Sequence, residues 1–215
     1  MPRRSQLDSL TDDAQPATQS AIQFATQRTT RCGAERVTSP RFAIADLLVE
    51  HDRALTYTDD LWRDLTDDEV RWRPSVDSSA IGWHLGHQAA VSHYMVRNLT
   101  AAEPPIDARL DQLMDSATAE RDRGDLPDLD RLRTFRDTAA DRLRFRIGAI
   151  ASGDVGAPQQ LSHIAIGLLL AVINHEYQHS KWIGEVRSRD LGHALPDSPV
   201  SDLLTEVDGY QVVGA

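Results

Sequence analysis

Two histidines spaced four residues apart give the strongest chemical signal in the sequence. His175 and His179 stand in the run NHEYQH. A step of four residues turns a helix by about 400°, so both imidazoles lie on one face and can chelate one metal ion. Leu168, Val172 and Ile183 share that face, so we expect both imidazoles to point into the protein interior. The alternative is a pair of core histidines that are held by hydrogen bonds.

A third ligand is expected on another helix, because a catalytic metal site commonly has three protein ligands and one open position. The run WHLGH offers His84 and His87. His87 shares a helical stripe with Ala80, Val91 and Tyr94, whereas His84 is rotated by about 60° from that stripe. We therefore predict His87 as the third ligand. His84 is either a residue beside the ligands or substrate, or a partly exposed histidine bonded to a nearby loop.

Three further residues are weaker candidates for the same site. His51 shares a helical face with Leu47 and Leu55 and is an alternative ligand, although a lone histidine on an apolar face is more often a core residue. Tyr94 is expected either to face the substrate or to pack in the core. Glu176 is expected either to orient a ligand histidine or to form an interhelical ion pair.

The run from His175 to His179 also matches the HExxH pattern of zinc metalloproteases, in which the glutamate is the general base. The extended metzincin pattern requires glycine and histidine where this sequence has Trp182 and Glu185. Glu185 is also turned away from His179 on the same predicted helix. We expect no strand pair that could hold a substrate peptide. The protease interpretation is therefore a minor alternative.

Four amphipathic segments must position these residues. Ser39-Pro40 is a helix start, and Thr66 to Glu69 has the form of a capping box. Residues from Pro104 to Asp125 alternate in charge and predict a partly helical, exposed crossover. The sequence predicts an all-α, antiparallel four-helix bundle with one longer crossover between helices 2 and 3. The long helices are expected over residues 39–64, 79–100, 129–153 and 159–189.

The 215 residues divide into three expected regions. Residues 1–38 are rich in Gln, Thr and Ser and keep no helical or strand period, which predicts a disordered N-terminal tail. A start codon assigned too far upstream would give the same pattern. Residues 39–195 are expected to form the helical bundle. Residues 196–215 are expected to form a C-terminal surface tail.

Composition narrows the classes of function. The formal net charge is −10, and arginines do not cluster with aromatic residues, which disfavours nucleic-acid binding. No apolar run reaches the roughly 18 residues of a membrane span, and the first ten residues lack the apolar stretch of a secretory signal. Cys32 is the single cysteine, so no internal disulfide can form. We expect a cytoplasmic protein with a small-molecule substrate.

Three runs of residues resemble the DinB-like superfamily. They are WRP at 72–74, SAIGWHLGH at 79–87 and NHEYQH at 174–179. The resemblance covers the chain from about Arg41 to Arg189. It implies a helical bundle that is often dimeric, with His87, His175 and His179 as ligands of one divalent metal ion. Zinc, iron and nickel all suit three imidazoles.

The resemblance also implies a class of activity. Characterised members of the superfamily include metal-dependent S-transferases that use mycothiol, bacillithiol or glutathione as a low-molecular-weight thiol. WHLGH and HEYQH are also similar to the DinB-like domain of the iron-dependent sulfoxide synthases that make ergothioneine, but those enzymes carry a second large domain. We therefore expect a thiol S-transferase. The alternatives are a metal-dependent hydrolase or iron oxygenase on the same site, and a noncatalytic, stress-related metal-binding bundle.

Overall fold

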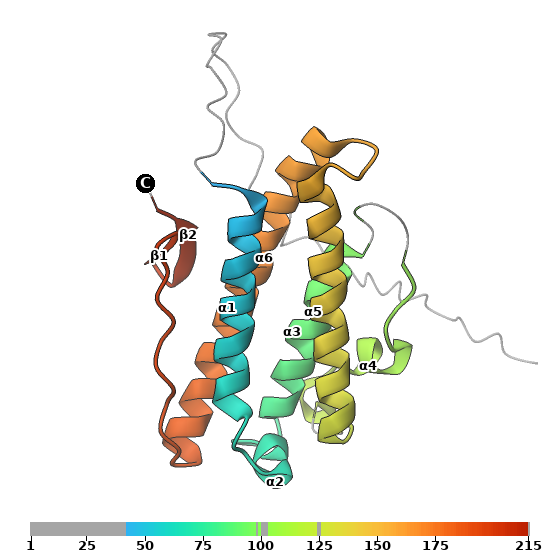
Figure 1. Cartoon of the computed structure of the whole chain (residues 1–215). Coiled ribbons are helices and arrows are strands. Elements are labelled where there is room, and N and C mark those ends of the chain that lie inside the picture. The colour runs from blue at the N-terminus through green and yellow to red at the C-terminus, as the bar shows by residue number, and fades with distance from the viewer. Residues whose placement is uncertain (1–41, 98, 100–102, 124–125, 215) are drawn as a thin grey trace, which may run out of the picture. The chain divides into compact units, whose positions relative to one another are not determined.

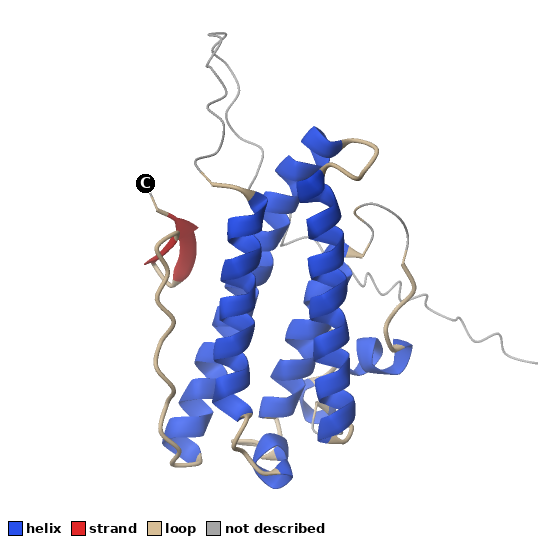
Figure 2. Cartoon of the chain, viewed as in Figure 1, coloured by secondary structure: helices blue, strands red, loops and turns tan. Residues whose placement is uncertain are grey.

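The computed structural model describes residues 42–97, 99, 103–123 and 126–214, and these residues are mostly helical (Figure 2). The long helices lie side by side, with α1 packed along α6 and α3 packed against both α5 and α6 (Figure 1). Their bounds are α1 Ile44–Trp62, α3 Ile81–Val96, α5 Leu129–Ser152 and α6 Pro158–Glu185. Shorter turns are α2 Asp67–Arg71, α4 Ala108–Leu113, the 3₁₀ turn η1 Glu120–Asp122 and the π-helical turn η2 Val186–Asp190.

The helix ends follow signals that the sequence contains. At α2, the Thr66 hydroxyl accepts from the Glu69 amide at 3.3 Å, and the Glu69 carboxylate accepts from the Thr66 amide at 2.8 Å. This is the predicted capping box. The Asp128 carboxylate caps α5 by accepting from the amide of Arg131 at 2.8 Å, and Gly153 ends that helix with a φ of 83°. The predicted tail 1–38 and the start at Ser39-Pro40 lie outside the described residues.

A β-hairpin near the C-terminus corrects the expectation that the chain has no strand pair. Strands β1 (Leu204–Val207) and β2 (Tyr210–Val213) are antiparallel. Asp208 and Gly209 join them with φ values of 52° and 83°, the pair of positive angles that a type I′ turn needs. The hairpin docks on α6, because the amide of Gln211 donates to Asn174 Oδ1 at 2.7 Å.

A buried polar layer interrupts the apolar core. It consists of Thr58, Gln88, Arg136, Glu176 and Ser180, all of which are at most 5% exposed. Along each long helix, these residues lie between positions that belong to two separate apolar clusters. One cluster contains Leu61, Trp62, Trp83, Leu132 and Ile183, and the other contains Leu47, Val96, Leu143, Ile147, Leu169 and Ile173.

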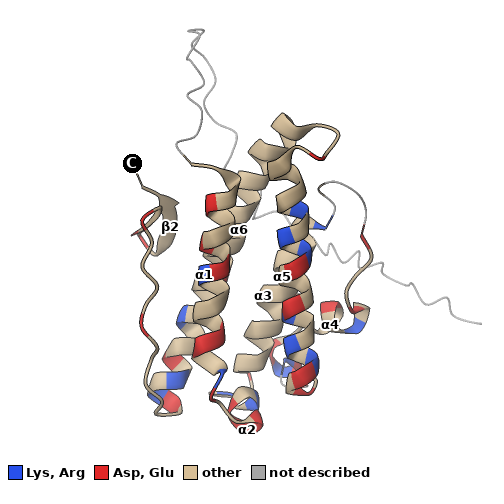
Figure 3. Cartoon of the chain, viewed as in Figure 1, with Lys and Arg blue, Asp and Glu red and all other residues tan. Residues whose placement is uncertain are grey.

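The outer faces of the helices carry both signs of charge. Acidic and basic residues are interspersed along α1 and α5 (Figure 3). Arg144 and Asp52 form one ion pair between these two helices at 2.7 Å. Such exposed pairs contribute about 0–1 kcal/mol each, so they do little to hold the helices together. No helix in the described ranges combines the length and apolar character that a bilayer crossing needs.

Candidate metal centre

Three imidazoles from two helices meet at one point. His87 comes from α3, and His175 and His179 come from α6. One ring nitrogen of each lies within 4.8 Å of the others. Nε2 of His175 is 3.3 Å from Nε2 of His87 and 3.1 Å from Nε2 of His179. The structure thus brings together the three residues that were predicted from their spacing. We refer to them as the histidine cluster.

The His87 ring is oriented by the crossover between α3 and α5. Its Nδ1 lies 2.6 Å from the carbonyl oxygen of Met114, so Nδ1–H donates to that oxygen and Nε2 keeps a lone pair. Trp83 stacks on the same ring with centroids 4.6 Å apart. Gly86 permits the close approach, since a Cβ there would lie 2.5 Å from the sulfur of Met114. The glycine of WHLGH therefore has a packing role.

The spacing of the cluster suits one small cation. Tetrahedral zinc holds imidazole nitrogens at about 2.0–2.1 Å, which places two such nitrogens about 3.3 Å apart. The Nε2 separations of 3.3 Å and 3.1 Å agree with that geometry. His87 directs a lone pair rather than a proton toward the other two rings. The cluster could therefore bind a divalent metal ion.

Burial favours the neutral form of these imidazoles. It lowers the pKa of His175 to about 4 and, together with the neighbouring histidines, the pKa of His179 to about 2. Burial also lowers the pKa of His87, against the opposite effect of the Met114 carbonyl. Neutral rings present ligand lone pairs at pH 7, and two lone pairs that face each other gain no hydrogen bond. A divalent cation would satisfy all three at once.

His84 lies behind His179 rather than in the cluster. The two Nδ1 atoms are 2.6 Å apart, so one ring must donate a proton to the other. When Nε2 of His179 is a ligand, its Nδ1–H donates to Nδ1 of His84. His84 is 9% exposed and packs against Trp182 with ring centroids 4.0 Å apart. This is the geometry of a residue that orients a ligand.

Three of the five residues of the polar layer are adjacent in sequence to the histidine cluster. Gln88, Glu176 and Ser180 each follow one of the three histidines. The Gln88 side-chain amide donates to the Glu176 carbonyl at 2.9 Å, and the Ser180 hydroxyl donates to the same carbonyl at 2.8 Å. Neighbouring helical side chains point about 100° apart. Bonds between α3 and α6 in the layer therefore fix the direction in which the imidazoles point.

Arg136 of α5 balances the buried charge of Glu176. Its Nη2 donates to Glu176 Oε1 and to Asp59 Oδ1, both at 3.2 Å, and its Nη1 donates to the Leu85 carbonyl at 2.9 Å. Thr58 of α1 donates to the same Glu176 oxygen at 2.7 Å. Burial raises the pKa of Glu176, while the charge of Arg136 opposes that shift. Through these contacts the layer ties all four long helices together.

The contacts of Glu176 bear on the HExxH alternative. Its carboxylate is held by Thr58 and Arg136 inside the core, and the side chain is 2% exposed. A general base must reach the proton that it abstracts. Glu176 instead forms the interhelical ion pair that was one of its two expected roles. The protease alternative therefore lacks an available base.

His51 and Tyr94 do not join the histidine cluster. His51 is 1% exposed, and neither of its ring nitrogens has a hydrogen-bond partner among the described residues. Burial lowers its pKa to about 4. His51 is absent from the group of converging ligand atoms in that part of the chain. Tyr94 is 66% exposed and lines a cavity rather than the core.

Several supporting residues escaped the sequence analysis. The hydrogen-bond partner of His87 is the backbone carbonyl of Met114. Every residue has such a carbonyl, so the sequence alone does not identify this partner. Arg136 stands among many arginines of α5, so only packing identifies it as the buried one. Gln88 and Ser180 could have been predicted from the sequence. They are polar residues that follow inward-facing histidines on mainly apolar helices, and buried polar residues need hydrogen-bond partners.

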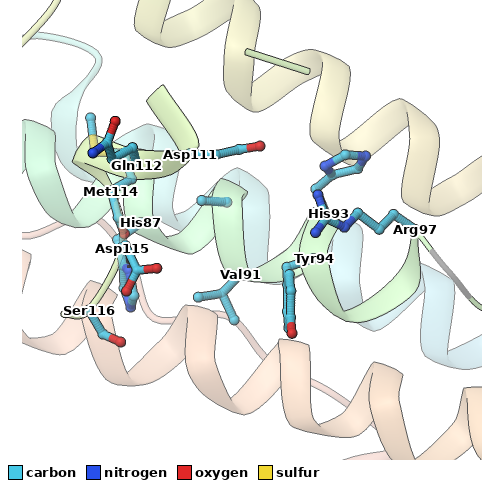
Figure 4. Close-up of a pocket in the computed structure, with 11 residues that line it drawn as sticks. His87, Val91, His93, Tyr94, Arg97, Asp111, Gln112, Met114, Asp115 and Ser116 are labelled. Atoms are coloured by element: carbon cyan, nitrogen blue, oxygen red, sulfur yellow. Dashed lines mark hydrogen bonds between the residues drawn. The ribbon is translucent and has the colours of Figure 1, made fainter. Parts of the chain in front are cut away.

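A cavity of about 470 Å³ borders the cluster at His87 (Figure 4). Helix α3 contributes His87, Val91 and Tyr94 to its lining, and the segment that includes Asp111 and Asp115 lines it as well. The volume is in the range of small-molecule sites. One side of the histidine cluster therefore borders space for a substrate.

Comparisons with known proteins place the chain in a family. A search of curated proteins finds no match. A family model described as the DinB superfamily matches residues 50–183, which is more than half of the chain. The matched stretch contains the whole histidine cluster and the whole polar layer. The resemblance inferred from the sequence is confirmed, and the chain belongs to the DinB superfamily.

Proposed function

We propose that this protein is a metal-dependent enzyme acting on small molecules, and specifically an S-transferase that uses a low-molecular-weight thiol of the mycothiol type. One observation carries the proposal. Three imidazole nitrogens converge in the histidine cluster, and His87 of that cluster lines a cavity, so three ligands lie next to space for a small molecule. Membership of the DinB superfamily supports the same assignment.

His87, His175 and His179 would hold the ion, which we expect to be zinc, iron or nickel. Such an ion would lower the pKa of a bound thiol, so that the thiolate would be available at neutral pH. In the transfer, an S–C bond would form at an electrophilic carbon. The bonding electron pair would go to the leaving group, or to the ring oxygen of an epoxide, and the thiol proton would pass to solvent. The chain contributes the ligands, the orientation of their rings and a partly enclosed cavity.

The proposal extends to the organisation of the chain. Helices α1, α3, α5 and α6 would form the antiparallel four-helix bundle of the superfamily, with residues 39–195 as its domain and 196–215 as a C-terminal surface segment. The side-by-side packing of the long helices supports this topology. We also propose a cytoplasmic homodimer with a small-molecule substrate and no nucleic-acid partner, consistent with the net charge of −10.

The test is thiol consumption by the metal-loaded protein. Mycothiol, bacillithiol and glutathione are each supplied with an alkyl halide and an epoxide, and the thioether product is quantified by mass spectrometry. We expect product formation that a chelator abolishes and that metal restores. His175→Ala should lose the activity, because it removes a ligand from the cluster.

His163→Ala is the matched control for that variant. His163 is an exposed histidine on the same helix, and its Nδ1 contacts only the carbonyl of Gln159 at 2.8 Å. This control should keep full activity. Metal-dependent turnover without a thiol would overturn the transferase in favour of a hydrolase. Bound metal without turnover of any of these pairs would favour a noncatalytic protein.

A further inference from the structure

An arginine that has no hydrogen-bond acceptor among the described residues lies at the end of the cavity away from the cluster. Arg97 follows α3 and lines the cavity together with His87. Its guanidinium turns back over the Tyr94 ring, with Cζ 5.0 Å from the ring centroid (Figure 4). Its Nε is buried and has no hydrogen-bond partner within the described part of the chain. No ion pair of Arg97 is found there either.

A buried guanidinium donor without an acceptor costs free energy. Arg136 and Arg187, which are buried, avoid that cost. Arg136 donates to Glu176 and Asp59, and Arg187 donates to both carboxylate oxygens of Asp64 at 2.6 Å and 2.9 Å. Arg97 differs from them because its half-buried side chain lines a cavity, where no described residue accepts a hydrogen bond from its guanidinium. A ligand in the cavity could supply an acceptor for the Arg97 guanidinium.

The remaining cavity wall restricts where a negative charge can lie. Asp115 stands near the cluster, and its charge acts on the His87 ring. Asp111 projects from α4 into the same space. Both carboxylates repel an anion, so away from the histidine cluster an anionic group is favoured against Arg97. Asp111 also suits a hydrogen-bond donor, such as an amide N–H, placed beside that anionic group.

The helix that carries these residues sets the length of the ligand. His87, Val91 and Tyr94 follow one face of α3, with an apolar side chain between the two ends (Figure 4). Ten residues separate His87 from Arg97, which is about 15 Å along the axis. Because the Arg97 side chain turns back by about one turn, the gap between the two groups is on the order of 10 Å.

We propose that this cavity binds an elongated organic acid whose carboxylate pairs with the Arg97 guanidinium and whose other end reaches the histidine cluster. A planar carboxylate matches the two parallel donors of a guanidinium. The inference rests on the proposed function for what happens at the cluster end, where the thiol sulfur would bind. Arg97 is assigned as the residue that selects the acidic end of the ligand.

The test compares two thiols of equal length on the cobalt-loaded protein. The probes are 6-mercaptohexanoate and 6-mercaptohexan-1-ol, which differ only in the charge of the far end. Calorimetry measures both affinities, and visible absorbance reports whether sulfur reaches the cobalt. We expect the acid to bind wild type roughly tenfold more tightly than the alcohol, as a charged hydrogen bond predicts. Arg97→Met should abolish this preference.

Arg109→Met is the matched control. Arg109 is an exposed arginine of α4 that does not line this cavity, so its loss changes the net charge equally and should leave the preference intact. Equal affinities in wild type, or a preference that survives Arg97→Met, would overturn the inference. If neither probe gives cobalt–thiolate absorbance, the thiol function fails, while the calorimetric preference still decides the role of Arg97.

Discussion

Three residues of the polar layer are adjacent in sequence to the histidine cluster on α3 and α6, but the layer and the cluster differ in whether their donors meet acceptors. In the layer, the donors of Gln88 and Arg136 meet acceptors on Glu176. In the cluster, the Nε2 atoms of His87 and His179 both approach that of His175. The polar atoms of the layer are matched by other described residues, whereas the cluster brings together three imidazole nitrogens that could bind a cation. Stability is thus expected to depend on the layer, and function on the cluster.

Removing the positive charge of the layer should cause the largest loss of stability. Arg136→Ala leaves the Glu176 carboxylate buried without its counterion, which costs about 3–5 kcal/mol. Urea unfolding of the metal-free protein measures the change. Arg133→Ala, at an exposed position of the same helix, should cost less than about 1 kcal/mol. A loss below about 1 kcal/mol for Arg136→Ala would show that the layer does not carry stability.

His51 sharpens the comparison, because it is a buried histidine outside both regions. Burial lowers its pKa in the folded chain from 6.5 to about 4, so the unfolded chain binds the proton first as the pH falls. Its contribution to stability is therefore complete above pH 6.5 and is lost as the pH falls to about 4. The loss amounts to at most about 3 kcal/mol.

His51→Leu should remove that part of the pH dependence. Urea unfolding of the metal-free wild type and variant at pH 7.5 and pH 4.5 gives the comparison, since every other buried histidine is present in both. His51→Leu should also leave metal content unchanged. An identical pH dependence in the two proteins would contradict the assignment of His51 as a neutral core residue, and loss of metal would make it a ligand.

Substitution of His84 should have the smallest effect, and it should change only the metal affinity of the histidine cluster. His84→Phe removes the acceptor for Nδ1–H of His179, and loss of such a partner typically weakens metal binding about 10–100-fold. His84→Asn should restore much of the affinity, since its Oδ1 can accept in place of Nδ1. Competition with a chromophoric chelator measures the affinities. Equal affinity in wild type and His84→Phe would show that His84 only fills space.

Helical periodicity predicted much of the site because ligands on one helix are related by rotation alone. His175 and His179 lie one turn apart, and His87 lies on the inward stripe of α3, so their convergence required only that α3 and α6 be neighbours. His51 also lies on an inward stripe. Periodicity does not fix the height of one helix against another, which is why this alternative stayed open.

Other features depend on contacts that periodicity does not describe. Arg136 is the same residue type as the exposed arginines of α5. Only its contact with Glu176 distinguishes it as the arginine of the polar layer. The Met114 carbonyl reaches His87 because Gly86 allows the crossover to approach. The hairpin is a different case, because Asp208 and the following glycine between alternating residues are a known turn signal that the sequence analysis overlooked.

The most direct test is the metal content of the purified protein, measured by elemental mass spectrometry. Wild type and the control His163→Ala should each carry close to one divalent ion per chain. His87→Ala, His175→Ala and His179→Ala should each lose it, because each removes one of the three converging nitrogens. A wild type without metal, or a His87→Ala variant that retains it, would contradict the assignment of the cluster as a metal centre.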